Sequence, residues 1–182
     1  YKSWQPIEQA TMSYGHGISV SLIQVARSYM IFARNGEMIP LSFQKVTQPP
    51  QPQRVISEKT AIQMREMLEL VVGPGGTAPQ AQVRGYRVAG KTGTAHKPGI
   101  GGYQDKYIAS FVGMAPASNP RLIVAVMVDE PSAGKYYGGE VAAPAFSAVM
   151  GATLRMMGIP QDAPNDNVIV PPADMAEVKE AT

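Results

Sequence analysis

The segment Lys91-Thr92-Gly93-Thr94 holds the side chains in this chain that are best suited to chemistry. An ammonium group and the hydroxyls of two threonines lie within four consecutive residues, on either side of a glycine. A glycine in such a place lets a ligand or another backbone approach closely. The ammonium and hydroxyl groups suit an anion, which could be a phosphate or a carboxylate. The choice depends on whether the segment begins a helix or forms a strand.

A phosphate-binding loop is one alternative, because Gly85 to Thr92 fits the pattern G-x-x-x-x-G-K-[ST]. Such a loop needs a helix that begins near the lysine, whose first N–H groups hold the phosphates. Here that helix would contain Gly93 and two threonines and would then meet Pro98, all of which disfavour a helix. The apolar run that ends in Asp129-Glu130 imitates the partner strand of such a loop, but it is equally typical of any buried central strand.

The other alternative is a strand from Arg87 to His96, with Lys91 and Gly93 on one face and Thr92 and Thr94 on the other. This arrangement would suit the carboxylate of a substrate. A lysine-bearing hairpin strand without any chemistry fits the same letters, so the segment alone does not decide between the two.

Motifs downstream of this segment occur in a distinctive order: Lys106 to Ala117, Asn119-Pro120-Arg121, the apolar run to Pro131, Gly134 to Gly139, and Val141 to Phe146. This order closely resembles the C-terminal half of the transpeptidase domain of class B penicillin-binding proteins, in particular the division-specific type. Upstream, Tyr14-Gly15-His16-Gly17 ahead of a helix from Ser21 to Ala33 is similar to the same family. The resemblance spans about residues 1–160.

The expected fold is therefore α+β, with an antiparallel sheet flanked by helices as in part of the penicillin-binding transpeptidase and serine β-lactamase fold. Short connections predict three antiparallel strands in this chain, near residues 86–96, 105–115 and 121–129. Residues 1–160 form one domain in this interpretation, and residues 161–182, rich in Pro, Asp, Asn and Ala, are predicted to be disordered. Other expected elements are helices at Val20–Arg34, from Ser57 to about Gly73 and at Gly138–Met157, and a strand at Leu41–Thr47.

Two elements of the family are missing from the sequence. No S-x-N or Y-x-N tripeptide occurs, and the family's S-x-x-K, with its acylated serine on a helix, has only two matches, at Ser42 and Ser132. Ser42 lies in the expected strand, where residues three apart face opposite sides, and Ser132 lies in a turn-rich loop after Pro131. The nucleophilic serine is therefore expected outside this chain, and the isolated fragment is expected to be inactive.

The resemblance implies that the complete protein is a serine-type D-Ala-D-Ala transpeptidase that cross-links peptidoglycan stem peptides at the septum and binds β-lactam antibiotics. Lys91 would supply positive charge near the substrate carboxylate, which the hydroxyls of Thr92 and Thr94 would help to hold. The Thr94 backbone N–H would be one of two oxyanion donors, and Gly93 would belong to the substrate-binding strand. The implied partners are the rest of its own domain and division-machinery proteins, at the bacterial inner membrane with the catalytic domain in the periplasm.

Composition narrows the remaining functions. A chain of 182 residues that is 45% hydrophobic can bury one core, and a net charge of +2 gives no indication of nucleic-acid binding. The apolar run Leu122–Val128 is far too short to span a bilayer. There are no cysteines, and His16 and His96 have no neighbouring ligand pattern, so no metal or cofactor is predicted. A related serine β-lactamase or carboxypeptidase and a non-catalytic divisome module remain as alternatives.

Overall fold

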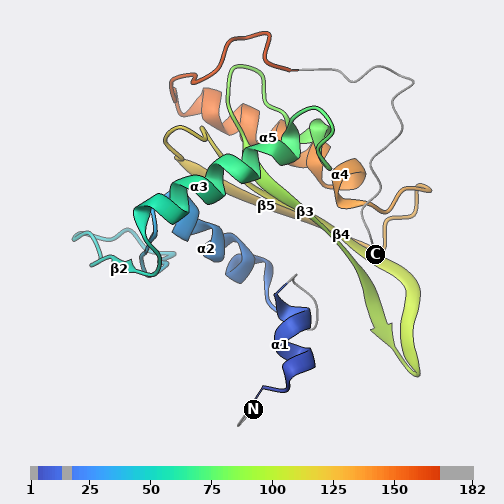
Figure 1. The fold of residues 1–182 in the computed structure, drawn as a ribbon. Helices are drawn as coiled ribbons and strands as arrows, with labels where there is room; N and C mark the ends of the chain where they lie inside the picture. Colours follow the sequence, from blue (N-terminus) through green and yellow to red (C-terminus); the bar gives the residue numbers. More distant parts are fainter. Residues whose placement is uncertain (1–3, 14–17, 169–182) are drawn as a thin grey trace.

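The computed structural model describes residues 4–13 and 18–168, and its centre is an antiparallel sheet in the order β3-β4-β5 (Figure 1). Strand β3 is Ala89–Gly99, β4 is Gly102–Ala115 and β5 is Leu122–Asp129. A turn at Ile100-Gly101 joins β3 to β4, and Gly101 takes a φ of 88° that favours glycine there. The predicted α+β class and its three antiparallel strands are confirmed.

Strand β4 is the middle strand and sets the register of both neighbours. Lys91 lies opposite Val112 and Gly93 lies opposite Ser110, with an irregularity in the pairing between His96 and Pro98. Within the described residues, no further strand pairs with the outer side of β3 or of β5. The sheet therefore has two open edges, and the segment that could do chemistry lies on one of them.

Helices cover both faces of the sheet (Figure 1). Helix α5 (Ala143–Met156) packs on one face, where the rings of Phe111 and Phe146 meet edge to face with their centroids 4.7 Å apart. This side holds the larger core, and its largest fully buried side chains are Val88, Phe111, Phe146, Met150 and Leu154. Burial of side chains of this size stabilises the fold by about 1.5–3 kcal/mol each.

The opposite face of the sheet carries helices α2 (Leu22–Ala33) and α3 (Glu58–Glu69). Ala89 and Met114 of the sheet pack there against Tyr29 and Phe32 of α2. The buried Arg65 of α3 ties the two helices together, since its Nη1 donates to the Phe32 carbonyl at 2.9 Å and to Asn35 Oδ1 at 3.0 Å. The molecule is thus a sheet between two helical layers.

Local signals explain where α2 and α3 begin and where α2 ends. The Ser21 hydroxyl accepts from the N–H of Gln24, and the Ser57 hydroxyl accepts from the N–H of Thr60, so each serine caps its helix. Helix α2 stops before Asn35 and Gly36, which both have positive φ, as the sequence predicted.

The predicted strand Leu41–Thr47 is wrong. Residues 39–52 are irregular, and the pairing falls on either side of them, between β1 (Glu37–Met38) and β2 (Gln53–Arg54). Ser42 folds back on Gln44, whose N–H donates to the serine hydroxyl at 3.1 Å. A short segment with alternating apolar residues, such as this one, does not form a stable strand unless a partner strand lies beside it.

The last helix is divided, which also differs from the prediction. Helix α4 (Gly138–Val141) and helix α5 are separated at Ala142, and Pro144 lies in the first turn of α5. A proline has no N–H to donate to the carbonyl of residue 140, so it starts a new helix instead of continuing the old one. The helix predicted from Ser57 to about Gly73 is present as α3 followed directly by the short 3-10 helix η1 (Leu70–Val72), whereas α1 (Pro6–Met12) and η2 (Pro79–Ala81) were not predicted. The motif Tyr14 to Gly17, with His16, lies outside the described residues.

Residues 161–168, which we call the C-terminal strap, are held against the domain. The Asp162 carboxylate accepts from the Arg87 N–H at 2.8 Å and from the N–H and hydroxyl of Ser118 at 3.1 and 2.7 Å. The Asn167 side chain accepts from the Gly85 N–H at 2.8 Å and donates to the Tyr86 carbonyl at 3.0 Å. The first part of the segment predicted to be disordered, residues 161–168, therefore makes defined contacts with the domain. Residues 169–182 lie outside the described part.

No helix within residues 4–13 and 18–168 combines the length and the apolar character that crossing a bilayer requires.

Candidate functional site

Lys91 to Thr94 lies in the first half of β3, on the outer edge of the sheet (Figure 1). The backbone continues as a strand to Gly99, and no helix begins at Lys91. The phosphate-binding loop is therefore ruled out, because its phosphate site would need helical N–H groups at this point.

The two threonines share one face of β3, as the sequence predicted. Thr92 is buried, and its hydroxyl oxygen lies 3.1 Å from the hydroxyl oxygen of Thr77. Thr94 Oγ1 accepts from the N–H of Gly138, the first residue of α4, at 3.0 Å. Both hydroxyls are thus oriented by neighbouring elements and do not rotate freely.

Lys91 is exposed and reaches back over its own strand. Its Nζ donates to the Thr92 hydroxyl at 3.0 Å and to the Thr92 carbonyl at 3.3 Å. No carboxylate forms an ion pair with Lys91 within the described residues. The positive charge therefore remains available to an incoming anion beside the strand edge.

Gly93 is a glycine for reasons of packing. A Cβ at this position would lie 2.5 Å from Ser110 Oγ, which donates to the Gly93 carbonyl at 3.2 Å. Gly138 of α4 packs equally closely, because a Cβ there would lie 2.8 Å from the Gly93 carbonyl oxygen and even nearer to that of Ser110. Gly138 therefore lets α4 sit directly on the backbone of β3 and β4, while the absence of a side chain at Gly93 leaves room for the Ser110 hydroxyl.

His96 lies within β3 and begins a row of aromatic ring contacts. Its ring centroid is 4.4 Å from that of Tyr107, which stacks on Tyr136 at 4.1 Å. Tyr136 contacts Tyr137 at 4.5 Å, just before α4. The His96 Nδ1 also lies 3.1 Å from the Gln104 carbonyl. The row links the outer part of the β3–β4 hairpin to the start of α4.

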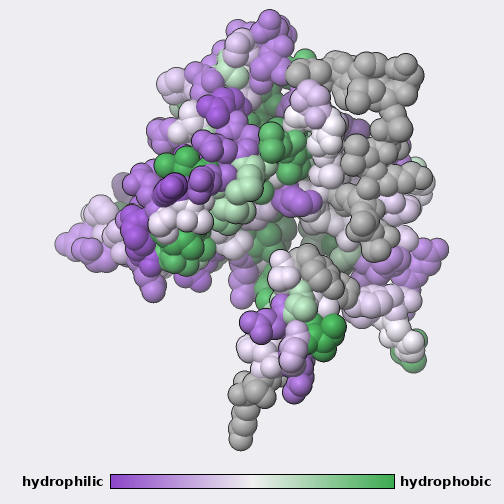
Figure 2. Space-filling model, viewed as in Figure 1, coloured by the Kyte–Doolittle hydropathy of each residue, from purple (hydrophilic) through white to green (hydrophobic). Residues whose placement is uncertain are grey.

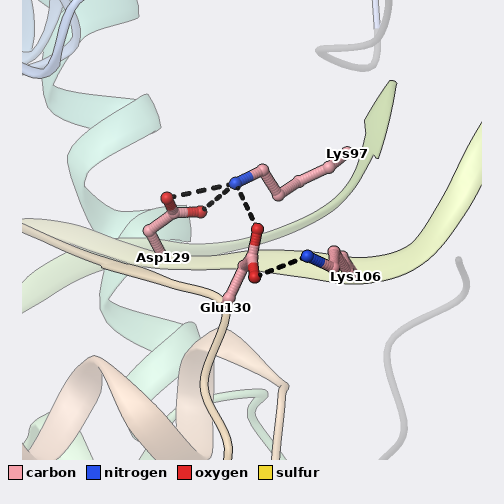
Figure 3. A network of polar contacts seen from close by, with 4 residues as sticks. All are labelled: Lys97, Lys106, Asp129 and Glu130. Carbon is pink, nitrogen blue, oxygen red and sulfur yellow. Dashed lines mark hydrogen bonds and ion pairs between the residues drawn. The ribbon is translucent and has the colours of Figure 1, made fainter. Parts of the chain in front are cut away.

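Four charged residues form a network at the end of β5 (Figure 3). Lys97 Nζ lies 2.8 Å from Asp129 Oδ1 and 2.8 Å from Glu130 Oε1, and Lys106 Nζ lies 2.9 Å from Glu130 Oε2. Hydrogen bonds from the two lysines lower the pKa of Glu130, and those to Asp129 and Glu130 raise the pKa of Lys97. The acidic pair therefore ends a strand at the surface, as expected, and joins all three strands.

Neither candidate nucleophile lies on a helix. Ser42 sits in the tight turn with Gln44, and Ser132 lies in an irregular segment, where the nearby Lys135 pairs with Glu140 at 2.9 Å. The expectation that these two S-x-x-K matches are not helical is confirmed.

One residue next to the site was missed from the sequence. Thr77 ends the glycine-rich stretch that begins at Gly73, and the composition of this stretch predicts a flexible loop. Its contact with Thr92 joins residues 15 positions apart, and no local pattern indicates such a pair.

A profile of the penicillin binding protein transpeptidase domain matches residues 1–151. This chain belongs to that family. It is 49% identical over 160 residues to the probable peptidoglycan D,D-transpeptidase PenA of Neisseria gonorrhoeae, covering 87% of this chain and 28% of PenA. It is 47% identical over 161 residues to the peptidoglycan D,D-transpeptidase FtsI of Escherichia coli, covering 88% of this chain and 27% of FtsI.

The apo transpeptidase domain of Burkholderia pseudomallei penicillin-binding protein 3 has a similar structure. The TM-score is 0.84 at 55% sequence identity, over 90% of this chain and 50% of that one. The resemblance to class B penicillin-binding transpeptidases is confirmed. The chain spans less than a third of the PenA and FtsI sequences and half of the solved domain.

Proposed function

We propose that this chain is the C-terminal part of the catalytic domain of a division-type peptidoglycan D,D-transpeptidase, and that β3 is its substrate-binding strand. The observation that carries this proposal is the position of Lys91 to Thr94 on an open strand edge, with an ammonium group beside it that forms no ion pair within the described residues. An extended peptide can add to such an edge through main-chain hydrogen bonds, which suits the end of a stem peptide.

In the proposed reaction, a serine attacks the D-Ala-D-Ala peptide bond, the terminal D-alanine leaves, and the acyl group passes to the amine of a second stem peptide. Lys91 and the Thr92 and Thr94 hydroxyls hold the substrate carboxylate. The Thr94 N–H donates to the oxyanion that forms when the serine attacks. A β-lactam carries a similar carboxylate and an acylating carbonyl, so the same groups would bind it.

The serine and the second oxyanion donor would come from the rest of the domain. Two features support this. The outer edge of β5 is unpaired within the described residues, and apolar residues remain on the surface (Figure 2), among them Ile18, Val20, Leu22, Ile23 and Met127. We propose that the remaining half covers these surfaces. A periplasmic position at the inner membrane and contact with division proteins are parts of the same proposal.

The test is Lys91→Ala in the full-length protein, with Lys97→Ala on the same strand as the matched control. We expect the rate constant for acylation by a fluorescent penicillin to fall about a hundredfold or more, as when a positioned electrostatic donor is lost. The melting temperature should hardly change, because Lys91 is exposed. Lys97→Ala should acylate normally.

Unchanged acylation in Lys91→Ala would contradict the role assigned to Lys91, whereas a wild-type full-length protein that is not acylated at all would favour a non-catalytic module. Rapid hydrolysis of the acyl-enzyme would instead indicate a β-lactamase or a carboxypeptidase.

A further inference from the structure

Thr77 lies at the junction of three elements beside the proposed substrate strand. Its hydroxyl meets that of Thr92 at 3.1 Å, and its carbonyl oxygen lies against Gly139 of α4, where a Cβ would overlap it. The following residue, Ala78, is fully buried and donates its N–H to the Val71 carbonyl at 2.9 Å. These contacts hold the backbone of Thr77 in place beside Thr92.

The hydrogen bonds of the Thr92 hydroxyl can be counted. A hydroxyl has one proton to donate and two lone pairs that accept. The Lys91 ammonium has no lone pair, so the contact of 3.0 Å to Thr92 Oγ1 uses one of the two lone pairs. The contact with Thr77 can then run in either direction: Thr77 donates into the second lone pair, or Thr92 gives its only proton to Thr77.

A carboxylate at the site decides the direction, because a carboxylate only accepts. If Thr92 is to hold it, the Thr92 proton must point to the carboxylate and Thr77 must be the donor. Resting on the function proposed above, we propose that Thr77 is a positioning residue: its hydroxyl donates to Thr92 and leaves the Thr92 proton free for the carboxylate of the substrate or the β-lactam. Thr77 itself does not touch the ligand.

The experiment compares benzylpenicillin with its methyl ester, in which the carboxylate is masked, on full-length protein by time-resolved intact-mass analysis. In Thr77→Val, which keeps the shape and removes the hydroxyl, acylation by benzylpenicillin should slow about three- to tenfold, as expected for one lost hydrogen bond. Acylation by the ester should stay at the wild-type rate. Thr77→Ser, which keeps the hydroxyl, should restore selectivity for the acid over the ester.

Thr153→Val is the matched control, because the Thr153 hydroxyl donates to the Val149 carbonyl of its own helix. Equal losses with both probes, or a Thr77→Ser variant that behaves like Thr77→Val, would overturn the inference and leave a packing role. If Thr77→Val does not fold, Thr77→Ala takes its place with the same expected loss of selectivity. Acylation that survives Lys91→Ala would count against the proposed function instead, so the two failures are distinguishable.

Discussion

Gly138→Ala should separate α4 from the substrate strand. The added Cβ would lie 2.8 Å from the Gly93 carbonyl oxygen and 3.2 Å from its nitrogen, and closer still to the Ser110 carbonyl oxygen. All three are backbone atoms of paired strands, which cannot turn aside as a side chain can. Helix α4 must then move outward by about 1 Å to restore ordinary contact distances.

A shift of that size breaks the bond of 3.0 Å from the Gly138 N–H to Thr94 Oγ1. Overpacking costs about 1–3 kcal/mol, and the lost hydrogen bond adds about 1 kcal/mol, while the better helix propensity of alanine returns up to about 1 kcal/mol. We therefore expect the free energy of unfolding to fall by about 1–3 kcal/mol. Because Thr94 loses its anchor, acylation should slow about ten- to a hundredfold.

The assay is acylation of full-length protein by a fluorescent penicillin, together with denaturant unfolding. Gly73→Ala is the control, because Gly73 has a φ of −78° and a Cβ there would meet only the Leu70 carbonyl, at 3.5 Å. That variant should match the wild type. If Gly138→Ala also matches the wild type in both measurements, the close contact of α4 with β3 does not position Thr94 and the reasoning is refuted.

Three further predictions concern the core, the charged network and the nucleophile. Burial raises the pKa of Tyr29 to about 12 from 10.0. The buried neutral Tyr29 therefore stabilises the fold fully below pH 10, and this stabilisation is lost as the pH rises towards 12. Tyr29→Phe should reduce the alkaline unfolding that circular dichroism detects. Hydrogen bonds from the two lysines lower the pKa of Glu130 from 4.5. The ionised Glu130 therefore stabilises the folded state above about pH 4.5, and this stabilisation is lost as the pH falls below it. Glu130→Gln should therefore reduce the difference in melting temperature between about pH 7 and about pH 3, less so in high salt. The isolated chain should gain no penicillin adduct by intact mass, and an adduct on Ser42 or Ser132 would show that the nucleophile was misplaced.

The sheet was predictable because its information is local. The strands are consecutive, the connections are short, and alternation places Thr92 and Thr94 on one face. The partners of these two threonines were not predictable. Thr77, which contacts Thr92, and Gly138, which contacts Thr94, lie 15 and 44 residues away in the sequence. A glycine-rich stretch was interpreted as a flexible connection, although here it lets a threonine approach the site.

The interpretations of two other segments differ from the structure for a similar reason. Leu41–Thr47 has the composition of a strand but pairs with no other strand among the described residues, and partner strands are not encoded locally. Residues 161–168 have a composition typical of disorder, but Asp162 and Asn167 satisfy backbone N–H groups of Arg87 and Gly85. Composition reports how much apolar surface a segment can bury and not which polar groups elsewhere it can satisfy.

The C-terminal strap also determines how tension would travel through the molecule. The Asp162 carboxylate accepts hydrogen bonds from Arg87, just before β3 begins, and from Ser118, just after β4 ends. A pull on the polypeptide beyond Val168 would therefore load the start of the proposed substrate strand through Asn167 and Asp162 before it reached α5. A handle for single-molecule stretching attached there would report on the mechanical strength of the β3–β4 pair, and Asp162→Ala would lower the unfolding force without touching the site itself.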